Sequence, residues 1–315
     1  MKTPFRVLAG GIASRSMEFL NRPMWAADLP MLARNEHAVA LRAMVSRYTA
    51  ACLPVMNGSF EYSNLREGPD QLLTCGPHRL WEYSSIFDVW QAKRSEAVLD
   101  VGGAASPLPY FLAERECDVT AIDLQPLLVH VCNDVAEKRK LSLRASVRDI
   151  TQDNSDWEGR FGLVTCISVL EHVPSPVRSK AFQSIAKILK PEGLFYLTFD
   201  YGTYSEQTGY GMAGGELSTG ISDLPGLCRE IEAAGLRFYG NDPRQLPPEI
   251  LALKASPGYE AFARRVSILY GVLDGASTWK SILGYTLRRI RGGRMARLPR
   301  IAQHNFFRMF LQRAG

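Results

Sequence analysis

Residues 97–107 read AVLDVGGAASP, and this stretch decides the fold. Its first five residues are apolar apart from Asp100, as is typical of a buried β-strand. The run of small residues that follows lets the backbone turn tightly and approach a ligand closely. Ser106 can cap the next helix, and Pro107 suits the first helical position because its missing N–H has no partner to lose there. The stretch therefore predicts a strand, a tight turn that fits a nucleotide-like ligand, and a helix.

Short apolar runs alternate with helical patterns after this turn. Besides 97–101, strands are predicted at 119–122, 143–147, 163–167, 194–199 and 236–239. Helices are predicted between them at 108–116, 126–140, 177–189 and 223–234. With a late strand at 306–312, the pattern predicts an α/β fold: a doubly wound, mostly parallel sheet of seven strands joined by right-handed crossovers. Ligands of such sheets bind beyond the carboxyl ends of the strands.

The regions on either side of this core are predicted to be helical. Residues 1–94 form an N-terminal cap, in which Asn35 caps one helix and a second helix follows Pro77. We interpret their apolar stripes as core packing. The stripes are Leu41, Met44, Val45, Tyr48 and Cys52, and then Leu80, Tyr83, Phe87 and Trp90, with Glu82 on another face.

The core is predicted to occupy residues 95–241, followed by a C-terminal region at 242–315. This region begins with several prolines and contains helical patterns at 258–273 and 278–291. If the strand at 306–312 returns to the sheet, these helices form an insertion rather than a separate domain.

The composition is ordinary for a globular protein: 46% of the 315 residues are hydrophobic and 22% are charged. No uninterrupted apolar run approaches the roughly 20 residues that span a bilayer. The six cysteines include no CxxC pair and the five histidines no H-x-x-x-H spacing, so no metal site is predicted. Scattered cysteines are typical of reduced thiols, and we expect a cytoplasmic protein.

Polar side chains follow three more of the predicted strands. Asp123 ends the second strand, where one carboxylate can accept both hydroxyl groups of a ribose, although an Asp here can also cap a helix. Asp149 follows the third strand, and Arg148 can pair with it at the surface. Glu171 and His172 follow the fourth strand, at the edge of the sheet where a site is expected.

Three stretches resemble class I S-adenosylmethionine-dependent methyltransferases. Residues 98–103, VLDVGG, resemble the first motif of that family, in which an acidic residue precedes spaced glycines. The family pattern is D-x-G-x-G-x-G, and Ala104 and Ser106 stand here at the second and third glycine positions. Residues 163–174, LVTCISVLEHVP, resemble the fourth strand with its acidic or histidine ending, and 189–198, LKPEGLFYLT, resemble the turn into the fifth. The G-x-G-x-x-G pattern of dinucleotide-binding proteins is not met, which disfavours a hydride-transfer enzyme.

The resemblance implies S-adenosylmethionine as the cofactor and a role for each site residue. Asp100 would lie near the methionine amino group, Asp123 would bind the ribose, and Asp149 would meet the adenine amino group. The other cofactor-binding residues that it implies are Gly102, Gly103, Ala104, Ser106, Leu124, Ile150 and Ser168.

Methylation by in-line displacement from a sulfonium uses a donor that is already activated, so the protein mainly positions the partners and excludes water. A base is needed only if the acceptor must lose a proton. His172 is the candidate, because histidine can accept a proton near neutral pH. Glu171 is the second catalytic candidate, as a support for the cofactor or the ligand. Asp200, Tyr201 and Tyr204 would face the acceptor.

Residues 202–220 are predicted to form a long loop, and such loops commonly act as lids. Together with the N-terminal helices, this loop suggests an enclosed site. The acceptor is then a small molecule, or the end of a glycan or lipid-linked chain, methylated on oxygen or nitrogen.

The C-terminal region is strongly basic. Residues 276–315 carry nine Lys or Arg and no Asp or Glu, in a chain with a net charge of +5. Such a segment can meet an anionic membrane surface or nucleic acid, or form a solvated helix face. An RNA or DNA methyltransferase is one alternative, disfavoured because no N/D-P-P-Y motif is present. A non-catalytic cofactor-binding homologue is the other.

Overall fold

The computed structural model describes residues 19–24, 28–32, 34–44, 77–104, 106–202, 221–251 and 304–315. At their centre is an eight-stranded sheet with the order β1-β8-β6-β5-β2-β3-β4, in which β7 also pairs with β8. The strands are β1 (Arg22–Pro23), β2 (Ala97–Val101), β3 (Asp118–Asp123), β4 (Leu143–Val147), β5 (Phe161–Ile167), β6 (Leu189–Gly202), β7 (Leu236–Phe238) and β8 (His304–Arg313). All seven predicted strands are confirmed, and β1 is an addition that is too short to leave a sequence pattern.

Strands β2 to β6 run parallel, as predicted. Strand β2 lies between β3 and β5, so the chain proceeds outward from the middle of the sheet in both directions. Strand β8 is antiparallel to β6, and β1 and β7 are antiparallel to β8. In open sheets of this kind the ligand crevice forms where the strand order reverses, which here is beside the carboxyl end of β2.

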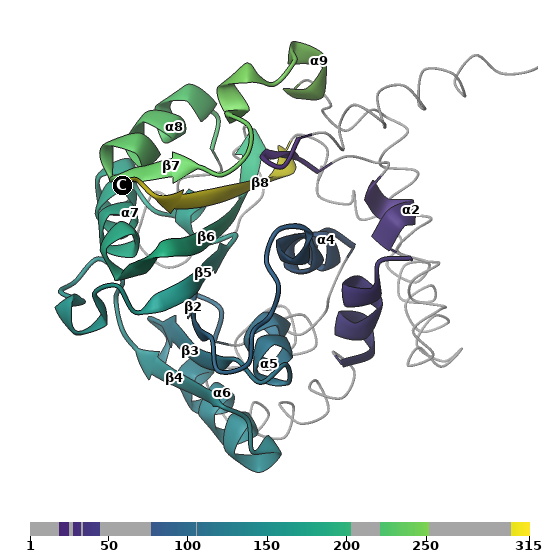
Figure 1. Cartoon of the computed structure of the whole chain (residues 1–315), viewed down its shortest axis with the longest axis vertical. Helices are drawn as coiled ribbons and strands as arrows, with labels where there is room; N and C mark the ends of the chain where they lie inside the picture. The colour runs from purple at the N-terminus through teal and green to yellow at the C-terminus, as the bar shows by residue number, and fades with distance from the viewer. Residues whose placement is uncertain are drawn as a thin grey trace, which may run out of the picture.

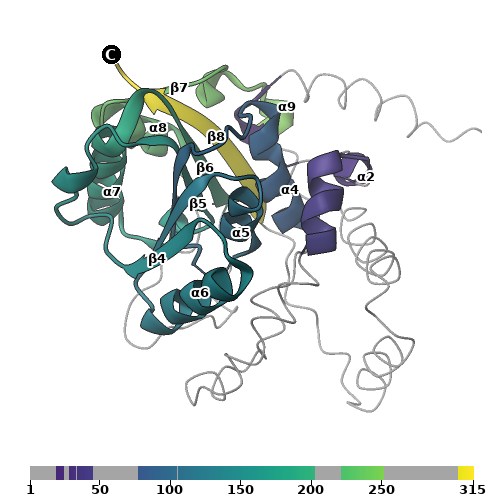
Figure 2. The same cartoon turned by 60° about the horizontal axis from the view of Figure 1, so that its bottom comes forward.

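Helices cover both faces of the sheet (Figures 1 and 2). Helices α5 (Pro107–Ala113) and α6 (Pro126–Arg139) contribute to one apolar cluster, and α7 (Ser175–Ile188) and α8 (Leu224–Ala233) contribute to the other. Val98 joins the first cluster and Leu99 the second, so neighbouring residues of β2 are buried on opposite faces. Burial on both faces explains why the strands read as continuous apolar runs.

The first crossover helix, α5, begins where the sequence predicts, but no side-chain hydrogen bond caps its first turn. Pro107 occupies the first position of α5. Ser106 takes the N-cap position with an extended backbone, yet its side chain makes no capping hydrogen bond. The predicted N-cap position of Ser106 is therefore confirmed, but no side-chain hydrogen bond accompanies it.

The N-terminal helices pack against the same core as the sheet. They comprise α2 (Asp28–Leu32), the helical residues 36–44, and α4 (Pro77–Ser85) with its 3-10 continuation η3 (Ile86–Asp88). The cap by Asn35 is confirmed, because its Oδ1 accepts the N–H of Ala38 at 2.9 Å. Leu41 and Leu80 share an apolar cluster with Val98 of β2. Val45, Tyr48 and Cys52 lie outside the described residues.

The predicted closing strand is confirmed: β8 enters the sheet beside β6, with Phe310 opposite Tyr196. A short 3-10 turn, η6 (Pro243–Gln245), and helix α9 (Pro248–Leu251) follow β7. The predicted helices at 258–273 and 278–291 lie outside the described residues. In the part of the chain that the structure describes, no helix is both long and apolar enough to cross a membrane.

Candidate functional site

The predicted site residues come from neighbouring strands and lie at one edge of the sheet. Asp100 is the fourth residue of β2, and Asp123 is the last residue of β3. Asp149 lies just beyond β4, and Ser168 just beyond β5. Because these strands are parallel and adjacent, their carboxyl ends meet along the same edge. The structure therefore brings the predicted cofactor residues together.

The turn after β2 requires its two glycines. Gly102 has a φ of +76°, and a Cβ there would lie 2.7 Å from a methyl carbon of Val169. At Gly103 a Cβ would lie only 1.8 Å from Oδ2 of Asp100. The N–H of Gly102 donates to the carbonyl of Ile122 at 2.8 Å, which fixes the turn to the tip of β3. These two glycines suffice for the bend, although Ala104 and Ser106 replace the other glycines of the family pattern.

Asp100 is a buried carboxyl group beneath this turn. Its side chain is 1% exposed, and its Oδ1 accepts a hydrogen bond from the hydroxyl of Thr165 on β5. Among the residues that the structure describes, its Oδ2 has no hydrogen-bond partner. Burial raises the pKa of Asp100 to about 7, with the Thr165 hydrogen bond lowering it and the charge of Asp123 raising it. A cationic donor above the turn would satisfy the remaining oxygen.

The raised pKa of Asp100 predicts that the ligand-free protein loses stability between pH 5 and pH 7. The folded protein holds a proton that the unfolded chain has already released, so stability falls as pH rises toward the folded pKa of about 7. One such proton changes the free energy of unfolding by up to about 1.4 kcal/mol per pH unit. Urea unfolding at several pH values, compared with Asp100→Asn, measures this slope. An equal slope in the variant would rule out Asp100 as its source.

Asp123 is joined to the same turn. Its carboxylate is 8% exposed, and its Oδ1 accepts the N–H of Gln125 at 3.0 Å. Burial raises the pKa of Asp123, while hydrogen bonds from the backbone of Gln125, Leu124 and Ala104 lower it. The bond from Ala104 links the carboxylate to the loop after β2. Asp123 thus stabilises the loop that follows β3 and remains slightly exposed at the sheet edge.

Two exposed apolar side chains flank Asp123. Leu124 is 67% exposed and Val147, at the tip of β4, is 54% exposed. Val147 is the strand partner of Asp123 in the β3–β4 ladder. A single exposed apolar residue is common, but a pair beside a recessed carboxylate offers an apolar surface to a planar ring. Leu124 was predicted from the sequence, whereas Val147 was missed because it reads as an ordinary strand residue.

Asp149 is partly exposed and held in a local turn. Its Oδ1 accepts both the N–H and the hydroxyl of Thr151 at 2.8 Å. Burial raises the pKa of Asp149, but the hydrogen bonds from Thr151 outweigh this effect and lower it. Ile150 is 7% exposed and packs into the core. Arg148 pairs with Asp156, with Nη1 and Oδ2 3.0 Å apart, so it is engaged away from Asp149.

The two catalytic candidates after β5 differ in exposure. They lie in the 3-10 turn η5 (Leu170–His172). The Glu171 side chain is fully buried, and that of His172 is 49% exposed, with Nε2 3.9 Å from Oε1 of Glu171. Oε1 of Glu171 also accepts the N–H of Asp200 at 3.3 Å. Burial, together with the charges of Asp200 and Glu82, raises the pKa of Glu171 well above its ordinary value. Of the two candidates, Glu171 is therefore closed to solvent and His172 is open to it.

The residues expected to face the acceptor lie on β6 or beyond it. Asp200 is 8% exposed near the end of that strand. Tyr201 packs edge-on against Phe307, with ring centroids 5.5 Å apart, and burial raises its pKa. Tyr204 lies outside the described residues, as does most of the predicted lid.

Sequence reasoning missed two buried polar residues of this edge. Thr165 is fully buried within the apolar run of β5, and its hydroxyl bonds to Asp100. A threonine in such a run is a signal that could have been used. Glu82 of α4 is also fully buried, and it contacts Ser168. It follows no motif, and only the packing of α4 reveals it.

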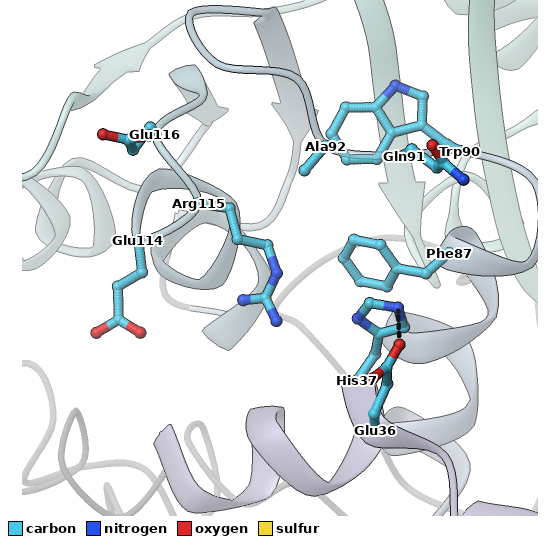
Figure 3. Close-up of a pocket in the computed structure, with 9 residues that line it drawn as sticks. All are labelled: Glu36, His37, Phe87, Trp90, Gln91, Ala92, Glu114, Arg115 and Glu116. Carbon is cyan, nitrogen blue, oxygen red and sulfur yellow. Dashed lines mark ion pairs between the residues drawn. The ribbon is translucent and has the colours of Figure 1, made fainter.

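A separate cavity of about 680 Å³ is lined by residues of the N-terminal helices and of the segments around α5, and Figure 3 shows its lining side chains. His37 stacks on Phe87 there, with ring centroids 4.2 Å apart, and the Arg115 side chain reaches toward them. Its other lining residues include 90–92, which precede β2, and 114–116, which follow α5. These segments lie toward the amino ends of β2 and β3, so the cavity is distinct from the site described above. Among the described residues, no group of three His, Cys, Asp or Glu could hold a metal ion.

Comparisons with known proteins found similarity in the central part of the chain. Residues 98–193 match a family model described as a methyltransferase domain. A ubiquinone biosynthesis O-methyltransferase from Coxiella burnetii (strain Dugway 5J108-111) is 34% identical over 108 residues, which are 34% of this chain and 45% of that protein. The protein of the same name from Xanthomonas oryzae pv. oryzae (strain PXO99A) is 33% identical over 133 residues, 42% of this chain and 53% of that protein.

This chain spans about half the length of the curated relatives it matches. Among solved structures, the cyclase SpnF aligns with a TM-score of 0.49 and 16% identity, over 76% of this chain and 82% of that one.

Proposed function

We propose that this chain, whose residues 98–193 form a class I S-adenosylmethionine-dependent methyltransferase domain, transfers a methyl group to an oxygen of a small-molecule acceptor. The observation that carries the proposal is the meeting of the turn after β2 with Asp123 and Asp149 at one sheet edge. The names of the matched relatives support an oxygen acceptor.

The residues at this edge fit the cofactor. Oδ2 of Asp100 is buried and, among described residues, has no partner, so it can accept from the methionine ammonium. The bare backbone of Gly102 and Gly103, with Ala104 and Ser106 after it, leaves room for close approach. Asp123 would bind the ribose hydroxyls, and Leu124 would pack against the adenosine.

Asp149 and Ile150 would line the adenine, and Ser168 would lie beside the methionine part. When bound, the cofactor supplies a methyl group on a positively charged sulfur, already activated for transfer. The protein's remaining work is to orient the acceptor, exclude water and take up a proton.

We assign the proton transfer to His172. Its half-exposed imidazole stands at the tip of β5, and it can accept the proton of an acceptor hydroxyl as the oxygen attacks. The buried carboxyl of Glu171, 3.9 Å away, supports the ring from within. Asp200 and Tyr201 would contact the acceptor from the side of β6.

The acceptor is proposed to be a small molecule, free or at the end of a glycan or lipid-linked chain. The basic residues that suggested an anionic membrane or nucleic acid lie mostly outside the described residues. We propose a cytoplasmic location, because Cys117, Cys132, Cys166 and Cys228 are free and buried.

Product analysis tests the proposed reaction. The full chain is incubated with methyl-labelled S-adenosylmethionine and a panel of phenols, alcohols, amines and transfer RNA. We expect label on a hydroxyl oxygen of a small molecule, located by mass spectrometry and NMR. Label on nitrogen or on RNA would contradict the oxygen assignment. Binding of S-adenosylhomocysteine without label transfer to any acceptor would favour a non-catalytic cofactor-binding protein.

A further inference from the structure

The buried carboxylate of Glu82 stands outside the matched domain but contacts the candidate site. Glu82 lies in α4, before residues 98–193, and its side chain is fully buried. Glutamate is almost never fully buried unless it is paired. The partners that allow Glu82 to be buried therefore show what its carboxylate holds in place.

The recorded polar contacts of Glu82 are with its own helix, with the residue that follows β5, and with the interior of β6. Oε1 accepts from the hydroxyls of Ser168 and Thr198, both at 2.7 Å. Oε2 pairs with Nη1 of Arg79 at 2.8 Å, and the carbonyl of Glu82 accepts the hydroxyl of Tyr196 at 2.7 Å. The helix is thereby tied to the end of β5 and to the interior of β6 by directional bonds, which fix position more narrowly than apolar contact does.

Ser168 is the contact with functional consequences. Its φ of 51° is left-handed, which costs a residue with a side chain roughly 1–2 kcal/mol. This conformation ends β5 and turns the chain into η5, which carries Glu171 and His172. The next residue, Val169, packs on Gly102, where an added Cβ would lie 2.7 Å from it. The backbone conformation at Ser168 thus sets the position of His172, the candidate base. It also sets the position of Val169, which packs against the turn after β2.

We infer that Glu82 is a positioning residue for methyl transfer. By holding Ser168, it fixes the position of His172 beside the acceptor and of Val169 against the turn after β2. The inference rests on the proposed function. Thr198 lies within β6, where strand pairing fixes its backbone, and its carbonyl accepts the N–H of Ser168 at 3.0 Å. Removing the Thr198 hydroxyl leaves this backbone bond in place, so its bond to Glu82 serves to anchor α4. Arg79 balances the buried charge.

The two hydroxyl donors form a matched pair for the test. Ser168→Ala and Thr198→Val each remove one 2.7 Å hydrogen bond to the same oxygen. The measurement is the titration of the His172 imidazole by NMR in the full chain, assigned with His172→Gln. We expect Ser168→Ala and Glu82→Ala to shift the His172 midpoint by at least about 0.5 pH unit, because a displaced η5 changes the exposure of the imidazole to solvent and its polar surroundings. Thr198→Val should leave it within about 0.1 unit of the unmodified chain.

Affinity for S-adenosylhomocysteine, measured on the same variants, separates the inference from the proposed function. Glu82→Ala, which leaves the Ser168 side chain in place, should weaken it severalfold through Val169, and Thr198→Val should not. Equal His172 midpoints in all variants, or equal shifts in Ser168→Ala and Thr198→Val, would overturn the positioning role and leave Glu82 as a fold anchor. If the unmodified chain binds no S-adenosylhomocysteine, the proposed function fails, while the His172 titration still tests the role of Glu82.

Discussion

The His172→Ala variant should turn over its acceptor about 10²–10⁴-fold more slowly than the unmodified chain, the range typical of a lost general base. Its affinity for S-adenosylmethionine should stay within about twofold, because the proposed base acts on the acceptor and not on the cofactor. The physical reason is exposure: the His172 side chain is 49% exposed at the tip of β5, whereas Glu171 is fully buried behind it. Initial rates at saturating cofactor measure the effect.

His130→Ala provides the control. His130 lies on α6 and is exposed to solvent, away from the tip of β5. This variant should keep full turnover. That result would show that losing an exposed imidazole away from the site does not lower the rate of methyl transfer. Full activity in His172→Ala would assign His172 a structural role, and an acceptor that ionises without help would then be the simplest explanation.

The Asp123→Ala variant should lose most of its affinity for S-adenosylmethionine. Hydrogen bonds to charged groups contribute about 1.5–3 kcal/mol each, so losing a carboxylate that accepts two ribose hydroxyls removes about 3 kcal/mol or more. For a cofactor bound with a Kd in the micromolar range, this weakens binding about 100-fold or more. Isothermal calorimetry with S-adenosylmethionine and S-adenosylhomocysteine measures both affinities.

Asp118→Ala is the matched control for Asp123→Ala. Asp118 is the first residue of the same strand, β3, and its carboxylate accepts from Ser142 and Arg144 at the opposite end. Its removal should leave cofactor affinity unchanged. Equal losses in both variants would point to a general weakening of β3, and an unchanged affinity in Asp123→Ala would remove the ribose assignment.

The sequence predicted the central sheet well because each strand there is buried on both faces. The apolar runs around Val98 and Leu163, and the helices between the strands, left no competing interpretation. The apolar runs at 97–101 and 119–122 placed Asp100 and Asp123 near strand ends. Parallel pairing of the strands then brought the two carboxyl groups to one edge of the sheet. Strand β1 escaped prediction because two residues carry no periodicity, and its pairing with β8 depends on residues almost 300 positions away.

The finer features of the site depend on tertiary packing. Glu82 falls off an apolar helix stripe and so reads as a surface residue, yet its carboxylate contacts the end of β5 and the interior of β6. Glu171 follows a strand end as an exposed site residue would, yet it is fully buried. Ser106 reads as a helix cap and makes no capping bond. In each case the residue type was known from the sequence, but the direction of the side chain depended on how the elements pack.

The structure of the chain bound to S-adenosylhomocysteine would test most directly whether one adenosyl ligand joins these strand tips. We expect the amino group at Asp100, the ribose hydroxyls at Asp123 and the adenine between Leu124 and Asp149. A ligand found instead in the cavity beside His37 and Phe87, or one that contacts only one of the three carboxylates, would contradict the proposed site.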